Sequence, residues 1–183
     1  MKRIVFLIAC TILLMGCGSN SAEKQQQLQS KTYECKHFSL SYPEGYYLEE
    51  EPAAEDDFHT LMIGKDSLDD NMTTIQWESP NTFPGTVKDF VTVFVYQEIN
   101  DYEQSNTFYD VMLEDSTYKI DGHPTHSITS VFTEGEDTII QSRIGLIIPQ
   151  KCDMMIVQRV NSKKSQDDVE IMGDIVKSIR FKE

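Results

Sequence analysis

Two histidines stand three positions apart in the tetrapeptide His123-Pro124-Thr125-His126, shortly after Asp121. Imidazole and carboxylate groups are ligands for zinc or copper, but a tetrahedral site needs about three or four of them. Because residues three apart on a strand point to opposite faces, the two imidazoles converge only if a turn at Pro124 bends the chain. We therefore expect a polar hairpin here and no metal.

Acidic runs at residues 49–51, 55–57 and 66–70 are a second candidate for chemistry, because carboxylates bind calcium. Calcium takes roughly six to eight oxygen ligands, and none of the runs has the Asp-x-Asp-x-Asp-Gly spacing that surrounds the ion. We expect a solvated acidic surface. The sequence also lacks the Gly-x-Ser-x-Gly, Gly-x-x-x-x-Gly-Lys, His-Glu-x-x-His and Cys-x-x-Cys motifs, so we expect no catalytic residue and no cofactor.

The composition narrows the class of partner. The 183 residues include 16 Lys plus Arg against 30 Asp plus Glu, which gives a formal net charge of −14. Nucleic acid attracts clusters of Lys and Arg that this chain lacks, so we expect no nucleic-acid partner. The length suits one ordinary domain, and 39% hydrophobic residues are enough for a core.

The amino terminus has the pattern of a bacterial export signal. Lys2 and Arg3 precede an almost entirely apolar run at residues 4–15, which is shorter than the ~20 helical residues that span a membrane. The motif that follows, Leu14-Met15-Gly16-Cys17, resembles the lipobox of bacterial lipoproteins. This resemblance implies a signal peptide at residues 1–16 and lipid on Cys17. An ordinary signal peptide that happens to contain Cys is the alternative.

Lipid on Cys17 would fix the location of the protein. Each buried CH₂ contributes roughly 0.8 kcal/mol, so two or three chains hold a protein on a membrane almost permanently. We expect a cell-envelope protein, in the outer membrane if the source has two membranes, because Gly18 stands where an inner-membrane retention signal would place Asp. Residues 17–32 carry almost no apolar side chains and are expected to form a flexible tether.

Cys35 and Cys152 are the cysteines that remain in the folded part. Because an exported domain meets an oxidising compartment, they could form a disulfide, provided that the ends of their strands are neighbours. Two buried free thiols, or one reactive cysteine, are the alternatives that the sequence leaves open.

Hydrophobic periodicity predicts a chain rich in strands with two helices. A strand at residues 38–42 is expected to pair with one at 46–48 across the Pro43-Glu44-Gly45 turn. Trp77 should pack in the sheet. Tyr46, Tyr47 and Tyr102 could form an exposed contact surface, or they could belong to the core or lie scattered over the surface. Further strands are expected at residues 58–63, 72–77, 108–114, 116–120, 125–133, 138–148, 154–160 and 178–181.

Two segments instead have the period of an amphipathic helix. Apolar residues recur at i, i+3, i+4, i+7 and i+8 within residues 86–99, and Thr86 with Asp89 matches a capping box. A second helix is expected after Ser165, with Asp168 completing its cap.

Several short motifs together resemble the domain shared by PsbP, Mog1 and DcrB-type proteins. They are a first strand ending in Tyr-Pro-Glu-Gly (42–45), a mid-chain helix, an Ile-Asp-Gly-His-Pro hairpin (120–124), and a last helix running into Ser-Ile-Arg-Phe (178–181). The resemblance covers most of residues 33–183. It implies an α+β fold, an α/β/α sandwich whose central antiparallel sheet is flanked by helices. It implies no shared catalytic residues, because such proteins are mostly accessory, assembly or binding proteins.

The sequence therefore predicts a non-catalytic envelope lipoprotein, anchored to a membrane through Cys17, that binds a protein partner. A binder of small ligands or carbohydrate is the second hypothesis, and a small hydrolase or thiol-dependent catalyst is the third. A concave pocket lined by convergent polar groups would favour the second or third hypothesis, and a flat aromatic patch would favour the first.

Overall fold

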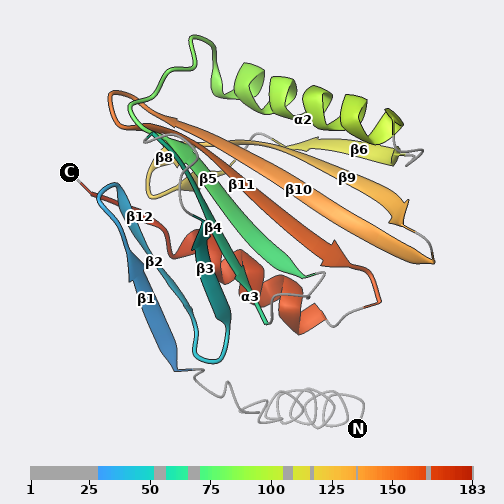
Figure 1. Ribbon diagram of the computed structural model, residues 1–183, viewed down its shortest axis with the longest axis horizontal. Coiled ribbons are helices and arrows are strands. Elements are labelled where there is room, and N and C mark those ends of the chain that lie inside the picture. The colour runs from blue at the N-terminus through green and yellow to red at the C-terminus, as the bar shows by residue number, and fades with distance from the viewer. Residues whose placement is uncertain are drawn as a thin grey trace, which may run out of the picture.

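The computed structural model describes residues 29–51, 57–65, 71–104, 109–115, 118–134, 136–163 and 166–182. In this part of the chain, a seven-stranded antiparallel sheet with the order β3-β4-β5-β11-β10-β9-β6 runs through the middle of the molecule (Figure 1). Its strands are β3 (Tyr47–Glu51), β4 (Phe58–Gly64), β5 (Met72–Glu78), β6 (Tyr109–Asp115), β9 (His126–Glu134), β10 (Asp137–Ile148) and β11 (Cys152–Asn161).

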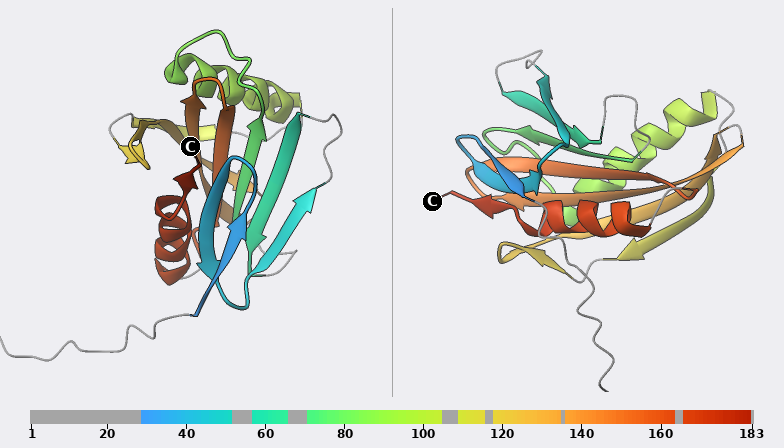
Figure 2. Two further views of the ribbon diagram at one scale, coloured as in Figure 1. Left: turned by 90° about the vertical axis from the view of Figure 1, so that its left-hand side faces the viewer. Right: turned by 90° about the horizontal axis from the view of Figure 1, so that it is seen from below.

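Helices cover both faces of this sheet (Figure 2). Helix α2 (Val87–Gln104) lies on one face, and helix α3 (Gln166–Lys177) lies on the other. Beside α3 is a second sheet of the described residues, formed by β1 (Ser30–Glu34), β2 (Phe38–Pro43) and β12 (Arg180–Phe181); β7 (Lys119–Ile120) and β8 (His123–Pro124) form a hairpin. The α+β fold, with a central antiparallel sheet flanked by helices, is confirmed.

The position of a strand in the sheet explains its sequence pattern. Strand β5 alternates, and buries Thr73, Ile75 and Trp77 on one face only. Strand β11 is buried at every residue from Cys152 to Ile156, because α2 covers one of its faces while α3 and β2 cover the other. A strand covered on both faces needs apolar residues at successive positions, so its sequence does not alternate.

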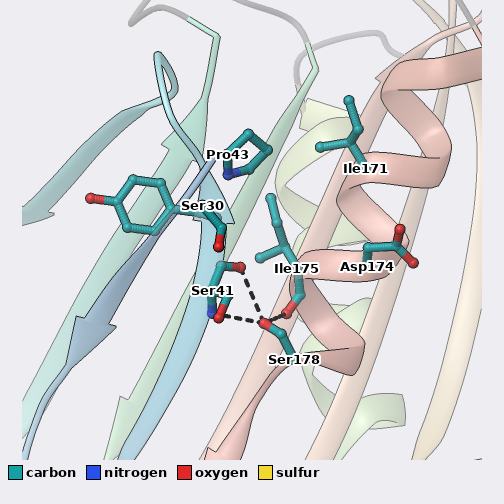
Figure 3. A pocket seen from close by; sticks show the side chains of 8 residues that line it. Ser30, Ser41, Pro43, Ile171, Asp174, Ile175 and Ser178 are labelled. Atoms are coloured by element: carbon teal, nitrogen blue, oxygen red, sulfur yellow. Dashed lines mark hydrogen bonds between the residues drawn. The ribbon is translucent and has the colours of Figure 1, made fainter. Parts of the chain in front are cut away.

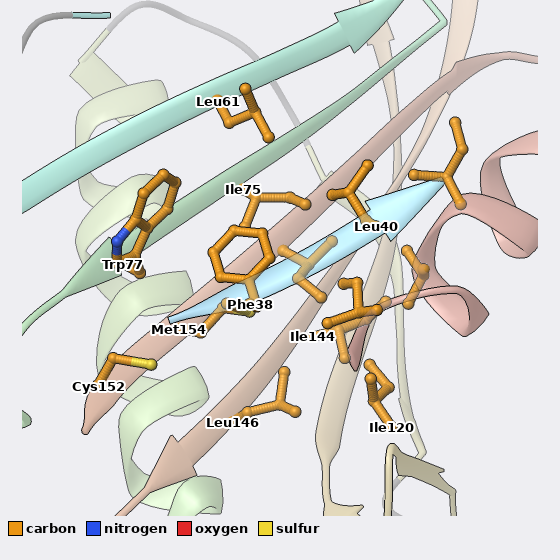
Figure 4. Packing of buried hydrophobic residues seen from close by; sticks show 14 of the residues in the cluster. Phe38, Leu40, Leu61, Ile75, Trp77, Ile120, Ile144, Leu146, Cys152 and Met154 are labelled. Carbon is orange, nitrogen blue, oxygen red and sulfur yellow. The ribbon is translucent and has the colours of Figure 1, made fainter. Parts of the chain in front are cut away.

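The main hydrophobic core lies between the central sheet and the layer of α3 and β2 (Figure 4). Phe38 stands at its centre, edge-on to Trp77 with ring centroids 5.1 Å apart. A smaller core on the opposite face consists of Val91, Val95, Ile128 and Met155, and fixes α2 to the sheet. The predicted packing of Trp77 in the sheet is confirmed, since the residue is only 1% exposed.

The predicted pairing of residues 38–42 with 46–48 is wrong. Strand β2 pairs with β1 and β12, whereas β3 pairs with β4 at the edge of the central sheet. One edge of β2 is therefore paired with β1 over residues 39–43, and β12 pairs with the strand at Phe38 and Ser39. The strand that takes one edge, β1, has a mostly exposed and non-alternating sequence, and periodicity did not reveal it. It begins at Ser30, so residues 30–32, assigned above to the tether, belong to a strand.

The capping box predicted for the first helix is confirmed. Thr86 Oγ1 accepts a hydrogen bond from the Asp89 amide at 3.2 Å, and Asp89 Oδ2 accepts one from the Thr86 amide at 2.9 Å. At the second helix, Ser165 lies outside the described residues. Asp168 is buried there and forms an ion pair with Lys65 at 2.7 Å.

A buried polar network fixes the middle of α2 to the sheet. Arg143 on β10 is 0% exposed, and its Nε donates to Glu98 Oε2 on α2 at 2.5 Å. The other oxygen of Glu98 accepts from Gln141 Nε2 at 2.7 Å. Arg143 Nη1 donates to the Gln141 carbonyl at 3.0 Å and to Ser130 Oγ. The guanidinium is thus buried with a carboxylate and further acceptors, which is the condition under which a protein tolerates a buried charge.

Helix α2 approaches the sheet closely at Gly145, and this contact yields a prediction. A Cβ at Gly145 would overlap Val91 Cγ2 and lie 3.1 Å from Phe90 Cδ1, so a Gly145→Ala variant must displace the helix. Overpacking of this kind costs about 1–3 kcal/mol, and we expect the free energy of unfolding in urea to fall by that amount.

Gly173→Ala is the matched control for this substitution. Gly173 lies within α3, where an added Cβ meets nothing nearer than Lys177 Nζ at 4.0 Å. Alanine favours helix over glycine by about 1 kcal/mol, so this variant should be at least as stable as the wild type. Equal stability of Gly145→Ala and wild type would contradict the close approach.

Candidate functional site

A polar cleft opens at the end of the molecule that carries the carboxy terminus, at the left of Figure 1. Its outer part has a volume of about 440 Å³ and its inner part about 260 Å³. Both parts are lined by Lys36, His37, Asp57 and Ser79; the outer part adds Pro80, Gln150, Lys151 and Lys182, and the inner part adds Cys35, Glu50, His59 and Trp77. We call the two parts together the edge cleft.

Backbone hydrogen bonds hold the walls of the edge cleft in place. The Cys35 amide donates to the Phe38 carbonyl at 3.0 Å and closes the tight turn that presents Lys36 and His37. The Lys182 amide donates to the His37 carbonyl at 3.0 Å, which joins the carboxy-terminal segment to this turn. Across the cleft, the Lys151 amide donates to the Ile148 carbonyl at 3.0 Å and shapes the turn between β10 and β11.

The loop after β5 is held by a buried carboxylate. Asp153 is 3% exposed, and its Oδ2 accepts hydrogen bonds from the amides of Thr82 and Phe83, both at 2.8 Å. The amide of Gln150 donates to Asn81 Oδ1 at 2.7 Å, so the same loop is also joined to the turn between β10 and β11. The cleft is therefore built from four connections that are fixed to one another.

Lysines outnumber carboxylates in the edge cleft, whereas acidic residues outnumber basic residues in the whole chain. Three lysines and two carboxylates line it, whereas the chain has 16 Lys plus Arg against 30 Asp plus Glu. Lys182 forms an ion pair with Glu34 at 2.6 Å, and Lys151 Nζ donates to the Lys182 carbonyl. Among the described residues, Lys36 has no ion-pair partner. Cationic groups are thus concentrated on an otherwise acidic protein.

The positive charge near His37 affects the pKa of its imidazole. Burial lowers the pKa of His37, and the positive charges of Lys36, His59 and Lys151 lower it further. Every charge that shifts this pKa is positive. The positive side chains near His37 thus lie in the same cleft as the carboxylates of Glu50 and Asp57.

Trp77 and His59 form the floor of the inner part. Their rings stack with centroids 4.9 Å apart and planes inclined by 11°. The indole nitrogen of Trp77 is buried and has no hydrogen-bond partner in the part of the chain that the structure describes. Figure 4 shows this nitrogen on the side of the ring that faces the beginnings of β2 and β11, which is the end of the sheets where the cleft opens.

Both cysteines of the folded part lie beside the edge cleft. Cys152 belongs to the main core, Cys35 packs against that core, and both are free thiols in the structure. Burial, the neighbouring Asp153 and the nearby Cys35 raise the pKa of Cys152 to about 12. A thiol that stays protonated is a poor nucleophile, which argues against a reactive cysteine at this position. A disulfide between Cys35 and Cys152 stays a prediction.

Of the two histidines first singled out, His123 lies on the β7–β8 hairpin, whereas His126 follows it in β9. Asp121 and Gly122 form the turn of the hairpin with φ values of 48° and 82°, and Asp121 Oδ2 accepts a hydrogen bond from the Phe181 amide at 2.8 Å. His123 packs edge-on against Phe181, whereas His126 is buried at the start of β9. Within the described ranges, no three side chains of His, Cys, Asp or Glu are grouped as metal ligands would be.

The other candidates are divided between described and undescribed residues. Residues 49–51 lie exposed on β3, as an acidic surface should, whereas residues 52–56 and 66–70 are outside the description. Tyr46 packs against the main core rather than forming an exposed patch, and the side chain of Tyr102 is not described. Cys17 and the lipobox also lie outside the described residues. None of the described helices is long and apolar enough to cross a membrane.

A smaller hollow of about 190 Å³ lies between β2 and α3 (Figure 3). Its lining is mostly apolar, with Pro43, Ile171 and Ile175 facing it. At its base, Ser178 Oγ accepts from the Ser41 amide at 2.8 Å and donates to the Ile175 carbonyl at 2.6 Å. These bonds join β2 to the end of α3, so we interpret the hollow as part of the packing between the strand and the helix.

Comparison with solved structures identifies the fold. The solution structure of cyanobacterial PsbP (CyanoP) from Synechocystis sp. PCC 6803 superposes with a TM-score of 0.56 at 13% sequence identity, and the match covers 91% of this chain and 99% of that one. The fold is PsbP-like. At this identity the PsbP-like fold is what the two proteins share, and no site residue is transferred from it.

A second match has a lower TM-score. LpqN, described as involved in cell envelope biogenesis of Mycobacterium tuberculosis, matches with a TM-score of 0.48 at 9% identity, covering 92% of this chain and all of that one. No protein-family model and no curated protein matches the sequence.

Sequence reasoning missed the edge cleft because its residues are distant in the chain. Lys36, Lys151 and Lys182 sit on three separate connections, and only the pairing of β2 with β12 and the placement of β11 bring them together. One signal was present. Each cysteine of the folded part has a lysine beside it, in Cys35-Lys36 and Lys151-Cys152. A disulfide would require the strand ends that carry Cys35 and Cys152 to be neighbours. The same requirement would bring Lys36 and Lys151, on two walls of the cleft, close together.

Proposed function

We propose that this protein is a non-catalytic accessory lipoprotein of the bacterial cell envelope, anchored through Cys17, which uses the edge cleft to bind a protein partner. The observation that carries the proposal is the relative position of tether and cleft. The predicted tether joins the domain at Ser30, the first residue of β1, and the cleft opens at the turn that follows the last residue, Glu34.

In this arrangement the cleft lies at the end of β1 opposite the tether. Five residues of extended strand separate Ser30 from the turn, which is roughly 16 Å at about 3.3 Å per residue. A membrane attached at the Ser30 end therefore leaves the opposite end, with Lys36 and His37, facing the aqueous compartment. Rigid walls and a cationic lining suit recognition of a soluble or exposed acidic partner.

The same cleft supports a second candidate function, binding of a small ligand. An outer volume of about 440 Å³ falls within the range of roughly 300–1,000 Å³ typical of ligand pockets. The concave shape and the convergent polar groups are the features that were expected to favour this hypothesis. A protein segment inserted into the cleft and a free small molecule would meet the same side chains.

Site-specific photo-crosslinking in intact cells tests the protein-binding role. A photoreactive residue at position 36, on the turn between β1 and β2, should yield a discrete crosslinked product. The same residue at position 163, at the far end of β11, should not yield it. A Lys151→Glu substitution should abolish the product from position 36, because it reverses the charge across the cleft. Equal products from positions 36 and 163, or no effect of Lys151→Glu, would contradict the proposal.

A further inference from the structure

The inner part of the edge cleft contains a hydrogen-bond donor that has no acceptor among the described residues. The Trp77 indole N–H is buried at its floor without a partner among the described residues, although the residue is only 1% exposed. A buried donor without an acceptor is unfavourable, and in native proteins such a group calls for a specific explanation. An acceptor atom that reaches the floor would supply the missing hydrogen bond.

The wall above this floor supplies positive charge. Lys36 is exposed and has no ion-pair partner in the described residues, and His37 lies beside it on the same turn. Lys151 faces His37 from the turn between β10 and β11. An acceptor that enters this part of the cleft thus meets cationic donors before it reaches the indole.

We infer that the edge cleft binds a carboxylate group where its two parts meet, held by Lys36 and His37, which line both parts, and by Lys151 of the outer part, near Trp77. Glu50 and Asp57 line the inner part and repel excess negative charge. A singly charged carboxylate therefore fits better than a phosphate dianion. The inference rests on the binding role proposed above and specifies that the bound group is a carboxylate.

The carboxylate can come from two sources that share this chemistry. One is the carboxyl terminus or an acidic side chain of the protein partner, and the other is a small organic acid. The carboxylate would lie beside Lys36 and His37, which line both parts of the cleft, in both cases. The outer part, of about 440 Å³, would hold the remainder of the ligand.

The single tryptophan of the chain makes the test direct. The lipid-anchored protein, purified in detergent micelles, gives one indole N–H signal in a ¹H–¹⁵N spectrum. We expect this signal to shift saturably on titration with acetate or N-acetylglycine, but not with chloride at equal ionic strength. Inorganic phosphate should shift it less at the same concentration. A peptide with a free carboxyl terminus, compared with its amidated form, distinguishes a protein source from a small acid.

Substitutions assign the binding to the named residues. Lys36→Met and Lys151→Met should each weaken acetate binding about tenfold, as expected for loss of a hydrogen bond to a charged group. Lys163→Met is the matched control. This lysine is exposed, pairs with Asp137, and lies beyond the opposite end of β11, so binding should be unchanged. Circular dichroism verifies that each variant is folded.

Three results would overturn the inference: no saturable shift of the indole signal, unchanged binding in both Lys36→Met and Lys151→Met, or phosphate binding as tightly as acetate. The experiments distinguish failure of the carboxylate inference from failure of the proposed protein-binding function. A saturable shift without a crosslinked partner would retain the carboxylate site and remove the protein-binding role. A partner crosslinked from position 36 without any carboxylate effect would do the reverse.

Discussion

A Cys17→Ser variant is expected to move almost entirely from the membrane fraction to the soluble fraction or the culture medium, or to stay as uncleaved precursor. Serine cannot form the thioether to diacylglycerol that the lipobox Leu14-Met15-Gly16-Cys17 implies. Each buried CH₂ contributes roughly 0.8 kcal/mol, so loss of two or three acyl chains removes far more binding energy than surface charges could replace. Metabolic labelling with palmitate, followed by fractionation and electrophoresis, measures both the lipid and the location.

Cys10→Ser is the matched control for this experiment. Cys10 lies in the apolar run of the predicted signal peptide, seven positions before Cys17, and would be removed with residues 1–16. The Cys10→Ser protein should therefore be labelled by palmitate and remain with membranes. A Cys17→Ser protein that still carries label and still sediments with membranes would contradict the anchoring proposal.

The acidic balance of the chain gives the lipid anchor a physical rationale. Removal of residues 1–16 would also remove Lys2 and Arg3, which makes a chain of net charge −14 more negative. Anionic lipids repel such a domain, so electrostatic attraction cannot hold it on the membrane. The concentration of lysines in the edge cleft, at the end of β1 opposite the tether, then favours contacts with groups in the aqueous compartment.

The sequence predicted the elements better than it predicted their partners. The alternation of Ile75 and Trp77 helped to identify β5, because one face of this strand is buried. The Thr86–Asp89 box identified the start of α2, because it consists of local hydrogen bonds that need no tertiary context. Local signals of this kind depend only on neighbouring residues in the chain.

Pairing between strands depends on the rest of the fold, and here prediction failed for β2. The Pro43-Glu44-Gly45 turn indicated a hairpin, yet β3 pairs with β4 in the central sheet, whereas β2 pairs with β1 and, at Phe38 and Ser39, with β12. The edge cleft was hidden for the same reason, since it depends on β12 lying beside β2. Trp77 was placed correctly in the core, but nothing in the alternating pattern showed that its N–H would lack an acceptor.

A Glu98→Ala variant is expected to lose about 3 kcal/mol of unfolding free energy. The substitution leaves the guanidinium of Arg143, 0% exposed, without its carboxylate, and removal of one partner of a buried pair typically costs about 3–5 kcal/mol. The lower end applies because Glu98 is itself 21% exposed, so water can partly solvate the freed charge. Urea unfolding followed by the fluorescence of the single tryptophan measures the change.

Replacement of both Glu98 and Arg143 separates two contributions to the free energy of unfolding. One is the cost of burying a charge without its partner, and the other is the stability that the ion pair itself provides. In Glu98→Met combined with Arg143→Met, both charges of the pair are removed, and apolar side chains of similar length fill the space beneath α2. Replacing a buried ion pair by well-packed apolar residues is often neutral or stabilising, so the double variant should be more stable than Glu98→Ala. If the double variant is less stable than Glu98→Ala, the network of Arg143 with Ser130, Gln141 and Glu98 contributes net stability of its own, and the cost cannot be assigned to loss of the Glu98 carboxylate from the guanidinium.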